Sequence, residues 1–113
     1  MEEKFKKLKS EFDAYIEEIK DSQVYTNYIN SKANLQNCSK ANDIVKTIKE
    51  LQQIKMQYKS NNISDIISNI ENDIETLYQQ YDLLFEVIHF NKAYDELSLV
   101  VNQIKYKLEN MMI

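Results

Sequence analysis

The chain contains neither glycine nor proline in its 113 residues. Glycine is the residue that readily adopts positive φ in tight turns, and proline is the residue that interrupts helices. Hairpin turns favour Asn-Gly, Asp-Gly or Gly-Gly pairs, and a chain without glycine can form none of them. Ile and Tyr recur instead at helical spacing. The sequence therefore predicts long, uninterrupted helices and argues against a β fold.

Apolar residues recur at three- and four-residue steps in five segments, which predicts helices over residues 2–20, 22–36, 39–60, 64–84 and 86–111. In the last two segments the steps alternate without a miss, as in the seam of packed helices. The fourth segment carries Ile63, Ile67, Ile70, Ile74, Leu77 and Tyr81. The fifth carries Val87, Phe90, Tyr94, Leu97, Val101, Ile104, Leu108 and Met111.

Additional apolar residues widen these stripes beyond a two-stranded seam, so each helix is expected to meet more than one neighbour. They are Ile66, Tyr78, Ile88, Ala93 and Val100. A chain of this length fits one domain. The prediction is an all-α antiparallel helical bundle of four to five helices with long C-terminal helices, forming a single domain over residues 1–113 and a dimer.

Three serines are expected to begin helices, because a serine oxygen can accept a hydrogen bond from a free N–H group of the first turn. They are Ser22, Ser39 and Ser64. The polar sequence Ser60-Asn61-Asn62 is the clearest turn in the chain and should end the third helix.

Charge is unevenly distributed. The basic residues are all Lys, and the net charge is −4, so the whole-protein field repels nucleic acid. Lys dominates between Ser31 and Lys59, whereas only acidic charges occur between Ser60 and Asn91. These complementary segments favour antiparallel pairing of the third and fourth helices, although two independently solvated faces remain the alternative.

The sequence contains no set of residues typical of catalysis or metal binding. His89 is the single histidine, and Cys38 is the single cysteine, which has no partner for an intramolecular disulfide. A zinc site needs three or four ligands, and a phosphate loop needs glycine. We therefore predict no enzymatic activity, no metal and no cofactor, although Cys38 could contribute one ligand to a site shared between subunits.

The sequence also predicts a cytoplasmic protein that does not insert into a membrane. The start MEEKFKK leads into an amphipathic helix and not into the apolar core of a signal peptide. The longest apolar cluster, LLFEVIHF at 83–90, is far shorter than the roughly 20 residues that span a bilayer.

That cluster is the best candidate for a protein interface, because it holds more apolar residues than one helix face can bury in a small bundle. The expected interface residues are Tyr81, Leu84, Phe85, Ile88 and Phe90, with Tyr25 and Tyr28 as a second choice. The alternative, that the preceding helices cover the cluster within one protomer, stays open.

The spacing of these residues resembles the YlbF/YmcA family. The first half carries Ser22-xx-Tyr25-xx-Tyr28, Leu35 and Ile44-xxx-Ile48-xx-Leu51, and the last helix carries Val87-xx-Phe90-xx-Ala93-xxx-Leu97. The resemblance implies a helical, often dimeric bacterial protein without enzymatic activity, linked to competence, sporulation and biofilm control and to a complex that modulates RNase Y. The chain lacks the prolines usual at two helix junctions of the family, and Cys38 matches no cluster-binding motif.

The resulting hypothesis is a helical adaptor that associates with itself or with related helical proteins, and with an RNase Y-type ribonuclease complex. Two alternatives are a direct RNA-binding module that uses the Lys-rich third helix, including Lys46 and Lys49, and a purely structural coiled-coil subunit.

Overall fold

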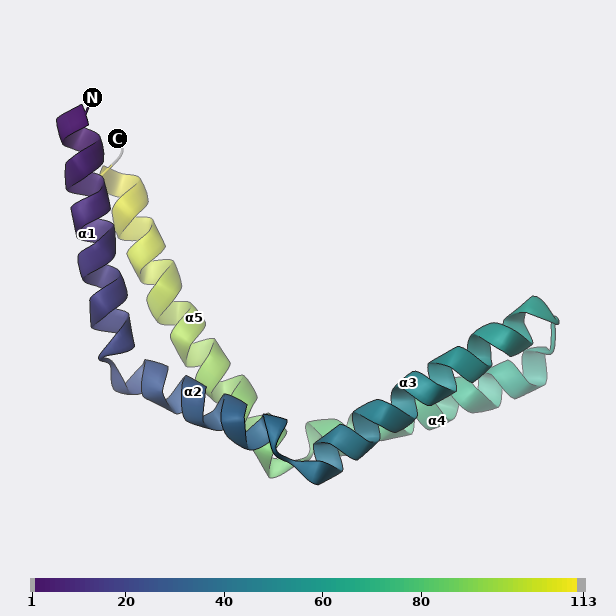
Figure 1. Ribbon diagram of the computed structural model, residues 1–113. Helices are drawn as coiled ribbons and strands as arrows, with labels where there is room; N and C mark the ends of the chain where they lie inside the picture. Colours follow the sequence, from purple (N-terminus) through teal and green to yellow (C-terminus); the bar gives the residue numbers. More distant parts are fainter. Residues whose placement is uncertain (1, 112–113) are drawn as a thin grey trace. The chain divides into compact units, whose positions relative to one another are not determined.

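The structure, a computed structural model, describes residues 2–111 as five α-helices (Figure 1). They are α1 (Glu2–Lys20), α2 (Gln23–Gln36), α3 (Ser39–Ser60), α4 (Ser64–Asp82) and α5 (Phe85–Met111). No strand occurs among these residues, and the all-α prediction with long C-terminal helices is confirmed. Helix α4 ends at Asp82, slightly earlier than expected, and α5 begins at Phe85.

The chain divides into two compact units. The first unit contains the residues up to Lys32 together with those from Phe90 onward, and the second unit contains Ala33–His89.

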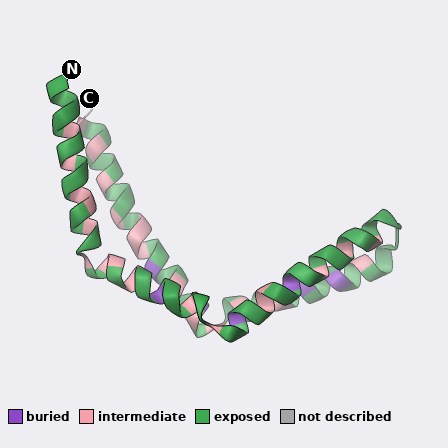
Figure 2. Cartoon of the chain, viewed as in Figure 1, coloured by how far each residue is buried: buried purple, intermediate pink, exposed green. Residues whose placement is uncertain are grey.

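The second unit is built on the antiparallel pair α3 and α4. Its buried centre consists of Ile48, Ile70 and Ile74, which come from the predicted apolar stripes of the two helices. Half-buried side chains surround this centre: Ile44, Leu51, Tyr58 and Leu77. Figure 2 shows buried positions on both helices. An ion pair of 3.1 Å between Lys55 Nζ and Glu71 Oε1 also joins α3 to α4, in agreement with their opposite charges.

The turn between α3 and α4 places Asn62 in the left-handed region, with φ of 57°. The Ile63 N–H donates to the Tyr58 carbonyl at 3.4 Å, and the Asn62 N–H donates to the Lys59 carbonyl at 3.3 Å. This pair of hydrogen bonds is the Schellman arrangement, in which glycine usually takes the left-handed position. In this chain, which has no glycine, asparagine occupies it because its short polar side chain tolerates positive φ.

Helices α3 and α4 begin at Ser39 and Ser64, the first residues of the predicted ranges, but only one of the three serines expected to cap a helix does so. The Tyr25 N–H donates to Ser22 Oγ at 3.2 Å, so Ser22 caps α2 as predicted. The capping role expected of Ser39 and Ser64 is wrong, because each is the first helical residue and the cap positions belong to Cys38 and Ile63. Neither of these residues makes a side-chain capping hydrogen bond.

The first unit contains α1, most of α2 and most of α5, and Figure 1 shows α1 alongside the C-terminal part of α5. The Lys107 Nζ lies 5.9 Å from the centre of the Tyr15 ring, a cation–π contact between these two helices. Helix α1 has no buried residue, although Leu8, Tyr15 and Ile19 are half-buried. The apolar side chains of α1 are therefore at most half-buried.

Candidate protein-binding surface

An exposed apolar surface lies where α4 ends and α5 begins. Leu83, Phe85 and Ile88, which we call the junction patch, are 78%, 73% and 52% exposed. Phe85 and Ile88 belong to the interface predicted from the sequence, and Leu83 is a residue that this prediction missed. Three exposed large apolar side chains within six residues make the junction a candidate surface for binding a partner.

The backbone at the junction explains why these side chains face outward. The Leu84 carbonyl accepts hydrogen bonds from the N–H groups of Val87 and Ile88, at 3.1 and 3.0 Å, and so begins α5. Val87 is almost completely buried and anchors this first turn. Because Phe85 and Ile88 are three residues apart, they share one helix face, while Val87 points elsewhere.

The other predicted residues at the junction are less exposed. Tyr81 and Leu84 are both half-buried, so they border the patch and do not project from it. The Phe85 ring is stacked with the exposed His89 ring, with 5.6 Å between the ring centres and 19° between the planes. Phe85 stays 73% exposed despite this stacking.

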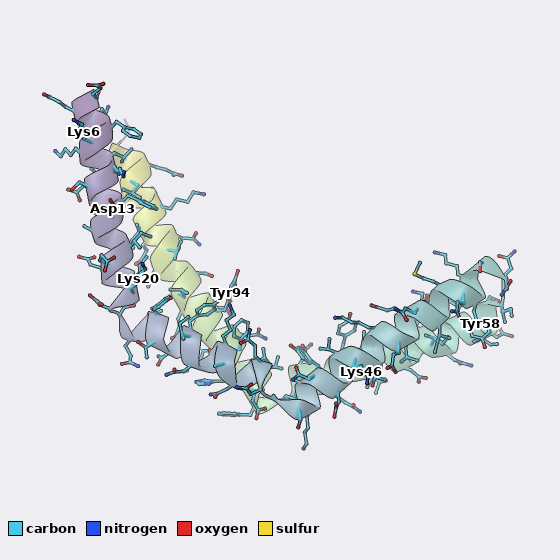
Figure 3. All side chains as sticks on the ribbon, viewed as in Figure 1. Lys6, Asp13, Lys20, Lys46, Tyr58 and Tyr94 are labelled. Carbon is cyan, nitrogen blue, oxygen red and sulfur yellow. The ribbon has the colours of Figure 1, made fainter. Side chains whose placement is uncertain are left out.

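The remaining predicted interface residues lie in the first unit, where the structure brings two of them together. The rings of Tyr28 and Phe90 are 5.8 Å apart, and Tyr94 lies 6.3 Å from Tyr28 and 6.2 Å from Phe90. Figure 3 labels Tyr94 on α5. Each ring in this aromatic cluster is partly covered by the other two, and such pairs contribute about 0.5–1.5 kcal/mol beyond area burial. A role of Tyr25, Tyr28 and Phe90 in binding a partner stays a prediction.

The Lys-rich helix α3 presents a shallow groove of about 290 Å³ lined by Asn42, Val45, Lys46, Lys49, Glu50 and Gln53. Lys46 and Lys49 are exposed, as an anion-binding site would require. The Glu50 carboxylate lines the same groove and would repel a phosphate group. The groove is therefore a weaker candidate for function than the junction patch.

Metal-ligand clusters and membrane-spanning helices are both absent from residues 2–111. Within residues 2–111, no three or more His, Cys, Asp and Glu side chains gather closely enough to hold a metal ion. Over the same range, no helix combines the length and apolar character needed to cross a bilayer.

Two comparisons place the chain among known proteins. A family profile described as "Control of competence regulator ComK, YlbF/YmcA" matches residues 8–112. The chain is also similar to a solved structure described as Bacillus subtilis RicA in complex with RicF. The identity is 20%, the match covers 91% of this chain and 90% of that chain, and the TM-score is 0.76. At this identity the similarity shows a common fold. No curated protein matches the sequence.

Proposed function

Because the chain belongs to the YlbF/YmcA family, we propose that it is a non-enzymatic regulatory adaptor that acts by binding another helical protein of the same family. The similarity to a helical protein crystallised with a second protein supports this proposal. The observation that carries it is the junction patch, where Leu83, Phe85 and Ile88 expose most or half of their apolar surface.

The physical argument is the cost of leaving this surface in water. Burial of apolar area contributes about 25 cal/mol per Å², so covering three large side chains provides several kcal/mol toward association. A helix is a suitable partner. Side chains three and four residues apart on the surface of a partner helix can pack between Phe85 and Ile88 of this chain. Tyr81 and Leu84 form the border that excludes water from the centre of the contact.

The finer part of the proposal concerns the cellular complex. We place the adaptor in the cytoplasm, in an assembly with related helical proteins that modulates an RNase Y-type ribonuclease. In such an assembly the adaptor contributes binding surfaces, and the ribonuclease contributes the chemistry.

The first test is retention of partners by the tagged full-length chain in its native cell, followed by binding measurements with the purified partner. Phe85→Glu introduces a charge into the centre of the patch, so we expect at least about a hundredfold weaker binding, as for a central interface residue. Titration calorimetry with wild type and variant measures the change. Gln79→Glu, an exposed α4 residue outside the patch, is the matched control and should bind normally.

Two outcomes would contradict the proposal. Equal binding by wild type and Phe85→Glu would exclude the junction patch as the interface. Recovery of RNA without a protein partner, with loss on Lys46→Glu and Lys49→Glu, would favour the RNA-binding alternative. Recovery of related helical proteins without a ribonuclease would remove the finer part alone.

A further inference from the structure

An acidic stripe runs along α4 and ends beside the junction patch. Four exposed residues follow one another at steps of four and three, so they share one face of the helix. They are Glu71, Glu75, Tyr78 and Asp82. Asp82 is the last residue of α4 and directly precedes Leu83, so the stripe leads into the junction patch.

The segment that contains the stripe and the patch is almost purely acidic in its charges. Residues 60–91 include six acids and no lysine, and His89 is the one residue there that can carry a positive charge. The acids are Asp65, Glu71, Asp73, Glu75, Asp82 and Glu86. Within residues 2–111, Glu71 is the one acid of this group in an ion pair, with Lys55 of α3 at 3.1 Å. Glu75 and Asp82 therefore have no cationic partner in the described chain.

We propose that the partner segment that covers the junction patch is a basic amphipathic helix. This inference rests on the adaptor function proposed for the chain and specifies the chemistry of the partner. Apolar side chains of the partner helix contact Leu83, Phe85 and Ile88. Lysines or arginines on its flank pair with Asp82 and Glu75, which lie seven residues and about 10 Å apart along α4.

The two parts of this surface have different effects on binding. The junction patch provides affinity, because burial of apolar area favours any partner with an apolar face. The carboxylates provide selection, because like charges across an interface are unfavourable and opposite charges speed the encounter. A lysine or arginine can also lay its apolar stem over the exposed ring of Tyr78 while its charged group reaches an acid. The surface therefore selects, among apolar helices, those with a basic flank.

The same charges argue against other classes of occupant. Nucleic acids and anionic lipid surfaces carry negative charge, so Glu75 and Asp82 repel both. The net charge of −4 adds to this repulsion. An amphipathic helix with an acidic flank would bury the patch but place its own carboxylates against those of the stripe.

The test uses the full-length chain and two synthetic amphipathic peptides of about 18 residues, which form five helical turns. Both peptides carry leucines at three- and four-residue steps. One carries lysines on its flanks, and the other carries glutamates at the same positions. Fluorescence anisotropy at low salt should show at least about tenfold tighter binding of the lysine peptide, and added salt should reduce this difference because it screens exposed charges.

Charge reversal within the stripe gives the sharper measurement. Asp82→Lys should weaken binding of the lysine peptide by at least about fivefold and strengthen binding of the glutamate peptide. Asp73→Lys is the matched control, because it makes the same charge change nine residues away, half a turn around α4, and should alter binding by less than about twofold. Circular dichroism verifies that both variants remain helical. The purified partner protein should respond to the two variants as the lysine peptide does.

Equal binding of the two peptides, or equal effects of Asp82→Lys and Asp73→Lys, would overturn the inference. Self-association of the chain that Phe85→Ser abolishes would also overturn it, because a second copy would then cover the patch. Loss of partner binding on Phe85→Ser without loss on Asp82→Lys would contradict the basic flank and leave the adaptor function intact. Partner binding that neither variant changes would contradict the adaptor function at this patch as well.

Discussion

At the scale of single residues, the lack of glycine has a measurable consequence at Asn62. This residue holds φ of 57° in the α3–α4 turn. Asn62→Ala should lower the free energy of unfolding by about 1 kcal/mol. Alanine has no polar side-chain group that can hydrogen-bond to the nearby backbone, so the left-handed conformation is less favourable for it than for asparagine. Asn62→Gly should not lower it. Thermal unfolding followed by circular dichroism measures both changes.

Asn61 provides the control for this prediction. It precedes Asn62 and has φ of −103°, so Asn61→Ala should cost less than Asn62→Ala. Equal losses at the two positions would show that side-chain hydrogen bonding, and not positive φ, determines the effect. The sequence predicted the turn from its polar residues but not which asparagine adopts the left-handed conformation, because that depends on the hydrogen bonds that close the end of α3.

At the scale of helices, the three serines near helix starts form a matched series. Ser22 Oγ accepts a hydrogen bond from the Tyr25 N–H, whereas Ser39 and Ser64 are first helical residues without that role. Ser22→Ala should therefore cost about 1 kcal/mol of stability. Ser39→Ala and Ser64→Ala should change stability by less than half as much, and urea unfolding of the three variants provides the comparison. A loss of the same size at all three would refute the assignment of the caps.

The same scale shows what sequence patterns can and cannot predict. The apolar spacing predicted the positions of the helices. Residues that it assigned to the apolar stripes of α3 and α4, among them Ile48, Ile70 and Ile74, are buried in the structure. The end of α4 was less accurate. Apolar residues continue across the junction, so their spacing did not indicate that α4 ends at Asp82 and α5 begins at Phe85. The outward position of Leu83 was therefore evident only from the structure.

At the scale of the whole molecule, the chain buries few of its large apolar side chains. The second unit has a small centre of isoleucines, and α1 has no buried residue. Exposed large apolar residues occur instead on α1, at the junction patch and along α5, where Leu99 and Tyr106 lie seven residues apart. This distribution is typical of proteins that bury further apolar area by association. The sequence indicated such association but could not assign each face to a partner.

Hydrogen exchange should therefore differ between helices. Amides of α3 and α4 around Ile48 and Ile70 should exchange slowly at any concentration, because opening them exposes the buried centre. Amides of α1 should exchange faster, because this helix has no buried residue. Equally slow exchange in α1 would instead mean that partial burial is enough to stabilise this helix.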